Sequence, residues 1–212
     1  DVTVTIGTSG AATEGTDYAT ISDITISAES TTGTASFTPT NDSTYEGDEA
    51  AAVAITAVSG GSATESGTQS VSITITEDDS APTVTLSAAS SSISEDAGTS
   101  ITLTATLSNA TTADVTVTIG TSGTGTEGTD YATISDITVS AGDTTGTASF
   151  TPTDDSTSEG SESAVIAITG VSGGSATESG TQTATITITD DDSSAAVTLS
   201  ISDSSIAENA GS

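Results

Sequence analysis

The sequence predicts an all-β chain of tandem immunoglobulin-like Greek-key β-sandwiches, with about seven strands in each repeat. Three observations support this fold class. Apolar and polar residues alternate with period two in short segments such as 2–6, 101–107 and 183–189, which is typical of half-buried strands. No segment carries the apolar stripe of an amphipathic helix. The whole pattern also recurs at a fixed interval along the chain.

The repeat interval is 113 residues. DVTVTIGTSG begins at Asp1 and again at Asp114, and 74 of the 99 positions are identical when residues 1–99 are aligned with 114–212. Copies this similar indicate recent duplication and a longer tandem array.

The register of the repeat predicts three units. Residues 1–81 (the first unit) form a partial repeat that lacks its first two strands, and residues 82–194 (the second unit) form a complete repeat. Residues 195–212 form the first strand and following loop of a third repeat. We expect the chain to be a slice of a longer protein in which residues resembling 100–113 follow Ser212.

Seven strands are predicted in the second unit, each from its own alternation of apolar and polar residues. Turn-forming Gly, Asn, Asp and Ser separate them. The core they offer is Val, Ile, Leu and Ala with a single Phe, which is thin. In chain order the strands are TVTLSAA at 83–89, TSITLTATL at 99–107, DVTVTI at 114–119, ATISDITV at 132–139, TTGTASFTPT at 144–153, SAVIAITGV at 163–171 and TQTATITIT at 181–189.

The composition alone would suggest a disordered chain. The 212 residues include 30 Asp and Glu and no Lys, Arg or His, so the formal net charge is −30, and aromatic residues make up 2%. High net charge with few aromatics is typical of disorder. The regular alternation of Thr, Val and Ile, which suit a pleated surface, instead favours folded strands.

Several functions are excluded by the missing residue types. Without Lys or Arg the chain cannot neutralise nucleic acid phosphates or bind anionic membrane surfaces. No apolar run approaches the roughly 18 residues of a membrane-spanning helix. Without His, Cys or Lys most catalytic bases and nucleophiles are absent, so we expect no enzymatic activity.

The acidic residues of the second unit gather at one end if each strand runs opposite to the one before it. The loops after the first, third and fifth strands and the end of the seventh strand then share that end. Eleven of the fifteen acidic residues lie in these segments: Glu95, Asp96, Glu127, Asp130, Asp154, Asp155, Glu159, Glu162, Asp190, Asp191 and Asp192.

Such a cluster needs protons or cations. Two like charges 4 Å apart repel by about 1 kcal/mol even in water, and the chain has no basic side chain to offset them. Calcium (Ca²⁺) takes six to eight oxygen ligands and suits the site, whereas Zn²⁺ prefers His or Cys and Mg²⁺ tolerates crowded all-protein cages poorly. A solvated acidic face that aids solubility is the alternative. The concentration of acids at one end favours the metal.

Four segments of the second unit resemble the Calx-β domain family. They are SEDAGT at 94–99, GTDY at 128–131, the acidic loop at 154–162, and DDD at 190–192. The family occurs in sodium–calcium exchangers, an integrin cytoplasmic region and many giant bacterial surface proteins. The resemblance covers the whole repeat and implies Ca²⁺ as the bound ion.

The resemblance also implies the ligands. The first unit departs from the pattern with Asn41 and Glu77 in place of acidic-loop and terminal Asp residues. Glu208 opens the ligand set of the third unit. The implied ligands are Glu95, Asp130, Asp154, Asp155, Glu159, Glu162, Asp190, Asp191 and Asp192 in the second unit, and Asp17, Asp42, Glu46, Glu49, Asp78 and Asp79 in the first.

The function expected from these features is a structural calcium-binding repeat array, a calcium-stiffened extracellular shaft or filament. The linkers at 78–82 and 191–195 are too short to swing freely. The expected partners are neighbouring repeats of the same chain and other copies in a filament. Extracellular calcium is often millimolar, which suits carboxylate sites of modest affinity, so we expect an extracellular or bacterial cell-surface location.

Two other functions stay open, an adhesin module that binds a ligand and a calcium-sensing domain. Five aromatic residues leave little for an adhesive patch, and near-identical repeats offer a sensor no obvious output. Tyr18 and Tyr131 each follow an implied ligand and are interpreted as core rings packed beside the loop. Asn109 lies in an Asn-x-Thr glycosylation pattern, which is a weak signal.

Overall fold

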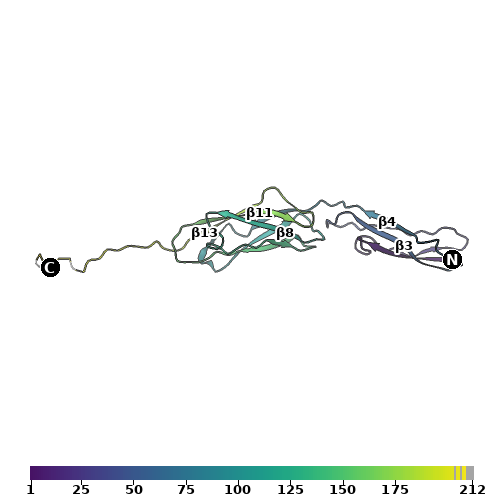
Figure 1. Cartoon of the computed structure of the whole chain (residues 1–212), viewed down its shortest axis with the longest axis horizontal. Coiled ribbons are helices and arrows are strands. Elements are labelled where there is room, and N and C mark those ends of the chain that lie inside the picture. Colours follow the sequence, from purple (N-terminus) through teal and green to yellow (C-terminus); the bar gives the residue numbers. More distant parts are fainter. Residues whose placement is uncertain (203, 206, 209–212) are drawn as a thin grey trace.

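The computed structural model describes residues 1–202, 204, 205, 207 and 208, and among these it is all-β apart from one short 3₁₀ turn. Two β units lie end to end, and residues 193–202 extend away from the second unit without forming a strand (Figure 1). In the part of the chain so described, no helix is long and apolar enough to cross a membrane. The predicted fold class, tandem all-β units, is confirmed.

The second unit is a sandwich of two sheets. Neighbouring strands are antiparallel except for two parallel pairs, β5 with β12 and β6 with β13. The 3₁₀ turn η1 (Glu95–Ala97) follows β6. One sheet has the order β10 (Thr145–Phe150), β7 (Ile101–Leu107), β5 (Thr83–Ala88), β12 (Thr177–Glu178); the other has β6 (Ser92–Ser94), β13 (Thr183–Thr189), β11 (Glu162–Ser172), β8 (Val115–Gly123), β9 (Ile137–Val139).

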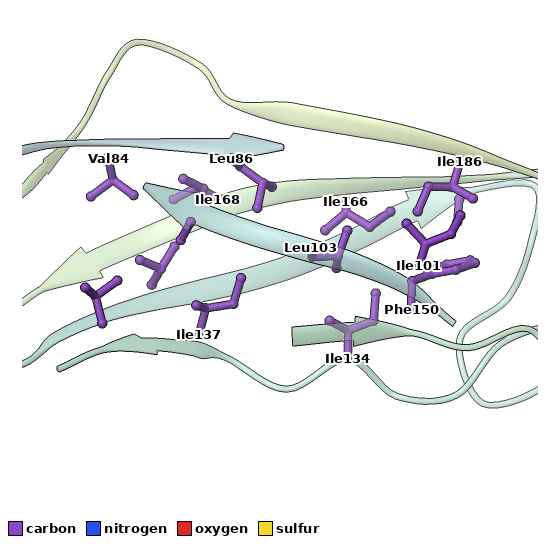
Figure 2. Close-up of a cluster of buried hydrophobic side chains, with 14 of the residues drawn as sticks. Val84, Leu86, Ile101, Leu103, Ile134, Ile137, Phe150, Ile166, Ile168 and Ile186 are labelled. Carbon is purple, nitrogen blue, oxygen red and sulfur yellow. The ribbon is translucent and has the colours of Figure 1, made fainter. Parts of the chain in front are cut away.

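The core of the second unit lies between these sheets. In β7 the four residues Ile101, Leu103, Ala105 and Leu107 are buried, and the Thr residues between them face outward. Side chains from both sheets, including Leu103 and Ile166, point toward one another in Figure 2. Burying each large aliphatic side chain contributes roughly 1.5–3 kcal/mol. The alternation of apolar and polar residues in the sequence therefore reflects one buried face on each strand.

The first unit has a single sheet with the order β2 (Ile24–Ile26), β1 (Val2–Gly10), β3 (Glu49–Ser59), β4 (Ser70–Ile75). Its buried hydrophobic residues are Val4, Ala12, Tyr18 and Ala51. Val53 occupies the position of Ile166 but is only half-buried, because no second sheet covers this face in the described residues.

One predicted strand is missing from the first unit. TTGTASFTPT occurs at both 31–40 and 144–153, yet it contains strand β10 only in the second copy. Strand β10 pairs with β7, and the first unit contains no counterpart of β7. Without that partner the same residues remain outside any strand.

Other strand predictions also need correction. The expected strand at 132–139 is limited to β9, and β6 and β12 were not predicted. The expected strand at the start of the third unit is not formed, since residues 190–202 contain no strand and Val197 is 97% exposed. The corresponding strand of the second unit, β5, pairs with β7, and no described residue takes the place of β7 beside this segment.

The two Tyr–Phe pairs confirm the interpretation of these tyrosines as core rings. Tyr131 is 1% exposed and stacks on Phe150, with ring centroids 4.8 Å apart. Tyr18 stacks on Phe37 at 4.6 Å in the first unit. Each ring anchors the loop that carries the acidic residue immediately before it.

Candidate metal centre

The antiparallel topology brings the acidic loops of each unit to one end, here called the acidic pole. In the second unit the acidic pole consists of residues 95–97, 124–131, 154–162 and 190–192. In the first unit it consists of residues 13–18, 41–49 and 77–79. This placement agrees with the alternation of strand direction assumed from the sequence.

The register of β6 and β13 places Glu95 beside Asp190. Ser94 pairs with Thr189 in the parallel ladder, so the next residue on each strand is acidic. One carboxylate oxygen each from Glu95, Asp190 and Asp192 lies within 4.8 Å of the others. Glu95 is only 8% exposed. Its Oε1 and Asp192 Oδ2 are buried without a hydrogen-bond partner in the described residues.

A second acidic group lies at the same pole. Oxygens of Asp130, Glu159 and Glu162 also lie within 4.8 Å of one another. Glu162 begins β11 opposite Ile188. The backbone carbonyl of Asp130 accepts the N–H of Thr153 at 2.9 Å, which joins its loop to the segment leading into Asp154.

Asp155 links the two groups electrostatically. Burial, together with the charges of Asp190, Asp192 and Asp155, raises the pKa of Glu95 to about 7. Burial and the charge of Asp155 also raise the pKa of Glu159. Because one carboxylate destabilises the charged form of both, the two groups form one electrostatic unit that a cation would relieve.

Asp190 also shapes the loop. Its Oδ2 accepts the N–H groups of Glu159 at 2.8 Å and Gly160 at 2.7 Å, and its Oδ1 accepts the N–H of Asp192 at 2.9 Å. These backbone donors, led by Gly160, lower the pKa of Asp190. These hydrogen bonds therefore favour the ionised form of Asp190 and hold its side chain against the loop that carries Glu159 and Gly160.

Glu77 accepts the equivalent hydrogen bonds in the first unit, and it was not predicted from the sequence as a site residue. Its Oε2 accepts the N–H groups of Glu46 at 2.5 Å and Gly47 at 2.7 Å, and its Oε1 accepts that of Asp79 at 2.9 Å. Burial acts to raise the pKa of Glu77, but these donors lower it overall. The signal was available, since position 77 is 113 residues before Asp190.

The first unit has its own pair of acidic groups. One contains Asp17, Glu46 and Glu49, and the other Glu77, Asp78 and Asp79. Both groups line one hollow at the pole, together with Asp42. Burial, followed by the charge of Asp17, raises the pKa values of Glu46 and Glu49.

Some implied ligands fall outside the four groups. Asp155, Asp154 and Asp42 still act on group members through their charges. Asp191 is repelled by Asp96, and Glu208 is exposed. The implied ligands outside the groups are Asp42, Asp154, Asp155, Asp191 and Glu208.

Glu127 lies at the pole for a different reason. Its Oε1 accepts the N–H of Ile134 at 2.8 Å, and its Oε2 accepts the hydroxyl of Thr121 at 2.7 Å. Glu14 makes the equivalent bonds to Ile21 and Thr8. These carboxylates hold the loop, and neither of them belongs to one of the four acidic groups.

The donor set fits a hard divalent cation such as Ca²⁺. Every side-chain donor in the groups is a carboxylate oxygen, two buried oxygens have no partner, and no basic residue exists to supply positive charge. Calcium prefers this chemistry. The assignment of individual ligands stays a prediction.

The three hydrogen bonds that Asp190 accepts from Glu159, Gly160 and Asp192, here called the Asp190 clamp, lead to a prediction about stability. Asp190→Ala leaves three backbone N–H groups without their acceptor, so we expect it to lower the melting temperature in chelator by about 5 °C or more, because each lost hydrogen bond to a charged acceptor is destabilising. Thermal unfolding followed by circular dichroism measures this. Asp191→Ala is the control and should leave the melting temperature within about 2 °C. Equal losses in both variants would contradict the clamp.

A family model described as "Calx-beta domain" matches residues 1–79 and 77–192. No curated protein sequence matches the chain.

Solved structures that match the chain include the apo form of the Calx CBD1 domain, with 19% identity over 52% of this chain and 99% of that one and a TM-score of 0.43. CBD12 from CALX1.2 has 15% identity over 88% and 86%, with a TM-score of 0.42. Domains 4 and 5 of the S-layer protein SbsC have 16% identity over 83% and 71%, with a TM-score of 0.29.

Proposed function

This chain belongs to the Calx-beta domain family, and we propose that it is a structural calcium-binding repeat array whose units are held in line by ions at their acidic poles. The observation that carries the proposal is the buried carboxylate of Glu95, which has a free oxygen and faces Asp190 and Asp192. A buried carboxylate without a partner is costly. A calcium ion would supply the missing positive charge and ligand bond.

The residues proposed to hold calcium are those that the topology gathers. The groups differ in size and charge between the units, so the number of ions can differ too. In the second unit they are Glu95, Asp130, Glu159, Glu162, Asp190 and Asp192, with Asp154, Asp155 and Asp191 beside them; in the first they are Asp17, Glu46, Glu49, Glu77, Asp78 and Asp79, with Asp42 beside them.

The proposed stiffening follows from where the linkers begin. Strand β4 ends at Ile75 and β5 begins at Thr83, so the linker starts inside the group formed by Glu77, Asp78 and Asp79. An ion bound there ties the root of the linker to the loops of its own unit. Without an ion, repulsion among these carboxylates opposes that arrangement.

We place this array outside the cell, as part of a bacterial surface shaft or filament with no catalytic role. Support comes from the match between millimolar extracellular calcium and carboxylate sites of modest affinity. Lateral contact with other copies would need bridging cations, because each copy of this chain carries a net charge of −30 and the copies repel one another.

Small-angle X-ray scattering of the 212-residue chain tests the shaft. In millimolar calcium we expect a rod of narrow length distribution, and in chelator a wider range of angles between the units. Identical scattering in both conditions contradicts the shaft. A calcium-dependent change within the loops that leaves the angle between units unaltered would instead support a calcium sensor.

A further inference from the structure

The two units meet through a direct contact as well as through the linker. Tyr45, in the 42–48 loop of the first unit, donates its backbone N–H to the carbonyl oxygen of Ala110 at 2.9 Å. Tyr45 also forms an isolated parallel β-bridge with Thr111. The 108–113 loop lies at the end of the second unit opposite its acidic pole. The acidic pole of one unit therefore contacts the opposite end of the next (Figure 1).

The loop that receives Tyr45 is well anchored. Thr111 is 2% exposed, and its carbonyl accepts the N–H of Gly142 at 2.9 Å. A Cβ added to Gly174 would come within 2.5 Å of the Thr111 side chain, so Gly174 allows close packing there. Asn109 Nδ2 donates to the linker carbonyl of Ser80 at 2.9 Å. The Asn-x-Thr pattern at Asn109 thus has a role in the junction.

The backbone N–H groups of residues 44–47 bond either to carboxylates of their own unit or to the next unit. Thr44 donates to Asp42 at 2.7 Å, and both Glu46 and Gly47 donate to Glu77. Tyr45 lies between them and donates outward to the next unit. The loop that presents carboxylates to the metal groups therefore also presents one backbone donor to its neighbour.

The second unit repeats this arrangement, except that the N–H equivalent to that of Tyr45 has no neighbouring unit to bond in the described residues. Thr157 donates to Asp155 at 2.6 Å, and Glu159 and Gly160 donate to Asp190. Ser158 is the counterpart of Tyr45. Its N–H makes no hydrogen bond to any residue that the structure describes.

We propose that the loop before β3 or β11 is the docking surface of each repeat for the repeat that follows, with the N–H of Tyr45 or Ser158 bonding the carbonyl at the position of Ala110. The occupant of the surface at Ser158 is the next copy of the 108–113 loop in the same chain. The inference deepens the proposed function and rests on it in one respect, because calcium would neutralise the acids that flank the docking residue.

Amide hydrogen exchange followed by NMR in calcium tests the contact in the 212-residue chain. We expect the N–H of Tyr45 to exchange about tenfold more slowly than that of Ser158, because only the first is bonded across a junction. Inserting Gly-Ser-Gly-Ser after Ser80 should raise the Tyr45 rate to that of Ser158. Equal rates in the unmodified chain, or protection that survives the insertion, would overturn the docking role.

Two further chains keep the proposal testable should the insertion disturb folding. Tyr45→Ser retains the N–H and should keep the protection, and its loss would overturn a backbone-mediated contact. A chain extended after Ser212 by a copy of residues 100–194 supplies the next receiving loop in the 113-residue register. In that chain Ser158 should become about tenfold more protected, and an unchanged rate overturns the proposal.

Failure of docking and failure of calcium binding give different results. If calcium raises the melting temperature but Tyr45 exchanges as fast as Ser158, only the docking inference fails. If calcium leaves the melting temperature unchanged, the proposed function fails, and the exchange rates still decide whether the contact exists.

Discussion

Millimolar calcium is expected to raise the melting temperature of the chain by about 10 °C above its value in chelator. An ion present at a hundred times its dissociation constant stabilises the folded state by about 2.7 kcal/mol. For a domain of about 100 residues, each kcal/mol raises the melting temperature by roughly 4 °C or more. Differential scanning calorimetry measures the shift, and a rise of less than about 5 °C would count against the metal centre.

Glu95→Gln sharpens this prediction because its effect should change sign with calcium. In chelator the substitution removes a buried charge repelled by Asp190 and Asp192, so the melting temperature should rise. In calcium the variant lacks a ligand and should lose most of the calcium-induced increase.

Glu127→Gln is the matched control. It removes one charge from the same pole, but Gln can accept the N–H of Ile134 and donate to Thr121, whose hydroxyl can act as an acceptor. Its calcium response should equal that of the original chain. If Glu95→Gln also keeps the full response, Glu95 is not part of a calcium site.

In chelator the chain is expected to melt about 8 °C higher at pH 5 than at pH 7.5. The pKa of Glu95 is about 7 in the folded protein and 4.5 as its ordinary value. Between these values the folded chain retains a proton that the unfolded chain has released. The resulting stability is complete below about pH 4.5 and is lost as the pH rises through 7.

Other acids of the two poles also contribute to the pH dependence. Burial and neighbouring charges raise the pKa values of Glu159, Glu162 and Asp192, which adds to the effect of Glu95. The lowered pKa values of Asp190 and Glu77 give stability that is lost only as the pH falls through their folded-state values, below this range.

Calcium should oppose this pH dependence, because protons compete with the ion for the same carboxylates. The calcium-induced rise in melting temperature should therefore be larger at pH 7.5 than at pH 5. A melting temperature in chelator that is constant from pH 5 to 7.5 would show that neither burial nor the neighbouring charges raise the pKa of Glu95.

The sequence could predict the acidic pole because strand direction follows from strand count. Glu95 and Asp190 are 95 residues apart, yet both follow strands that end at the same side of the sandwich. The alternation of apolar and polar residues also identified the buried face of β7. These features depend on local pattern and chain reversal, which a single sequence contains.

Features that depend on a distant partner could not be predicted locally. The decapeptide at 31–40 is identical to that at 144–153, but only the second copy lies beside β7. Strands β6 and β12 are too short to show a period and form by parallel pairing. Glu77 was passed over because it departs from the Asp at the equivalent position 190, although both carboxylates accept the corresponding backbone N–H groups.

If every unit docks on the next as Tyr45 docks on Ala110, each step along the array has the same rotation and the same translation. Applied at every step of a long tandem array, the same operation generates a screw, with a handedness and a pitch set by a few backbone atoms. Tyr45 and Ser158 differ at this step. A chain that alternates the two residues would have a helical period of two repeats rather than one.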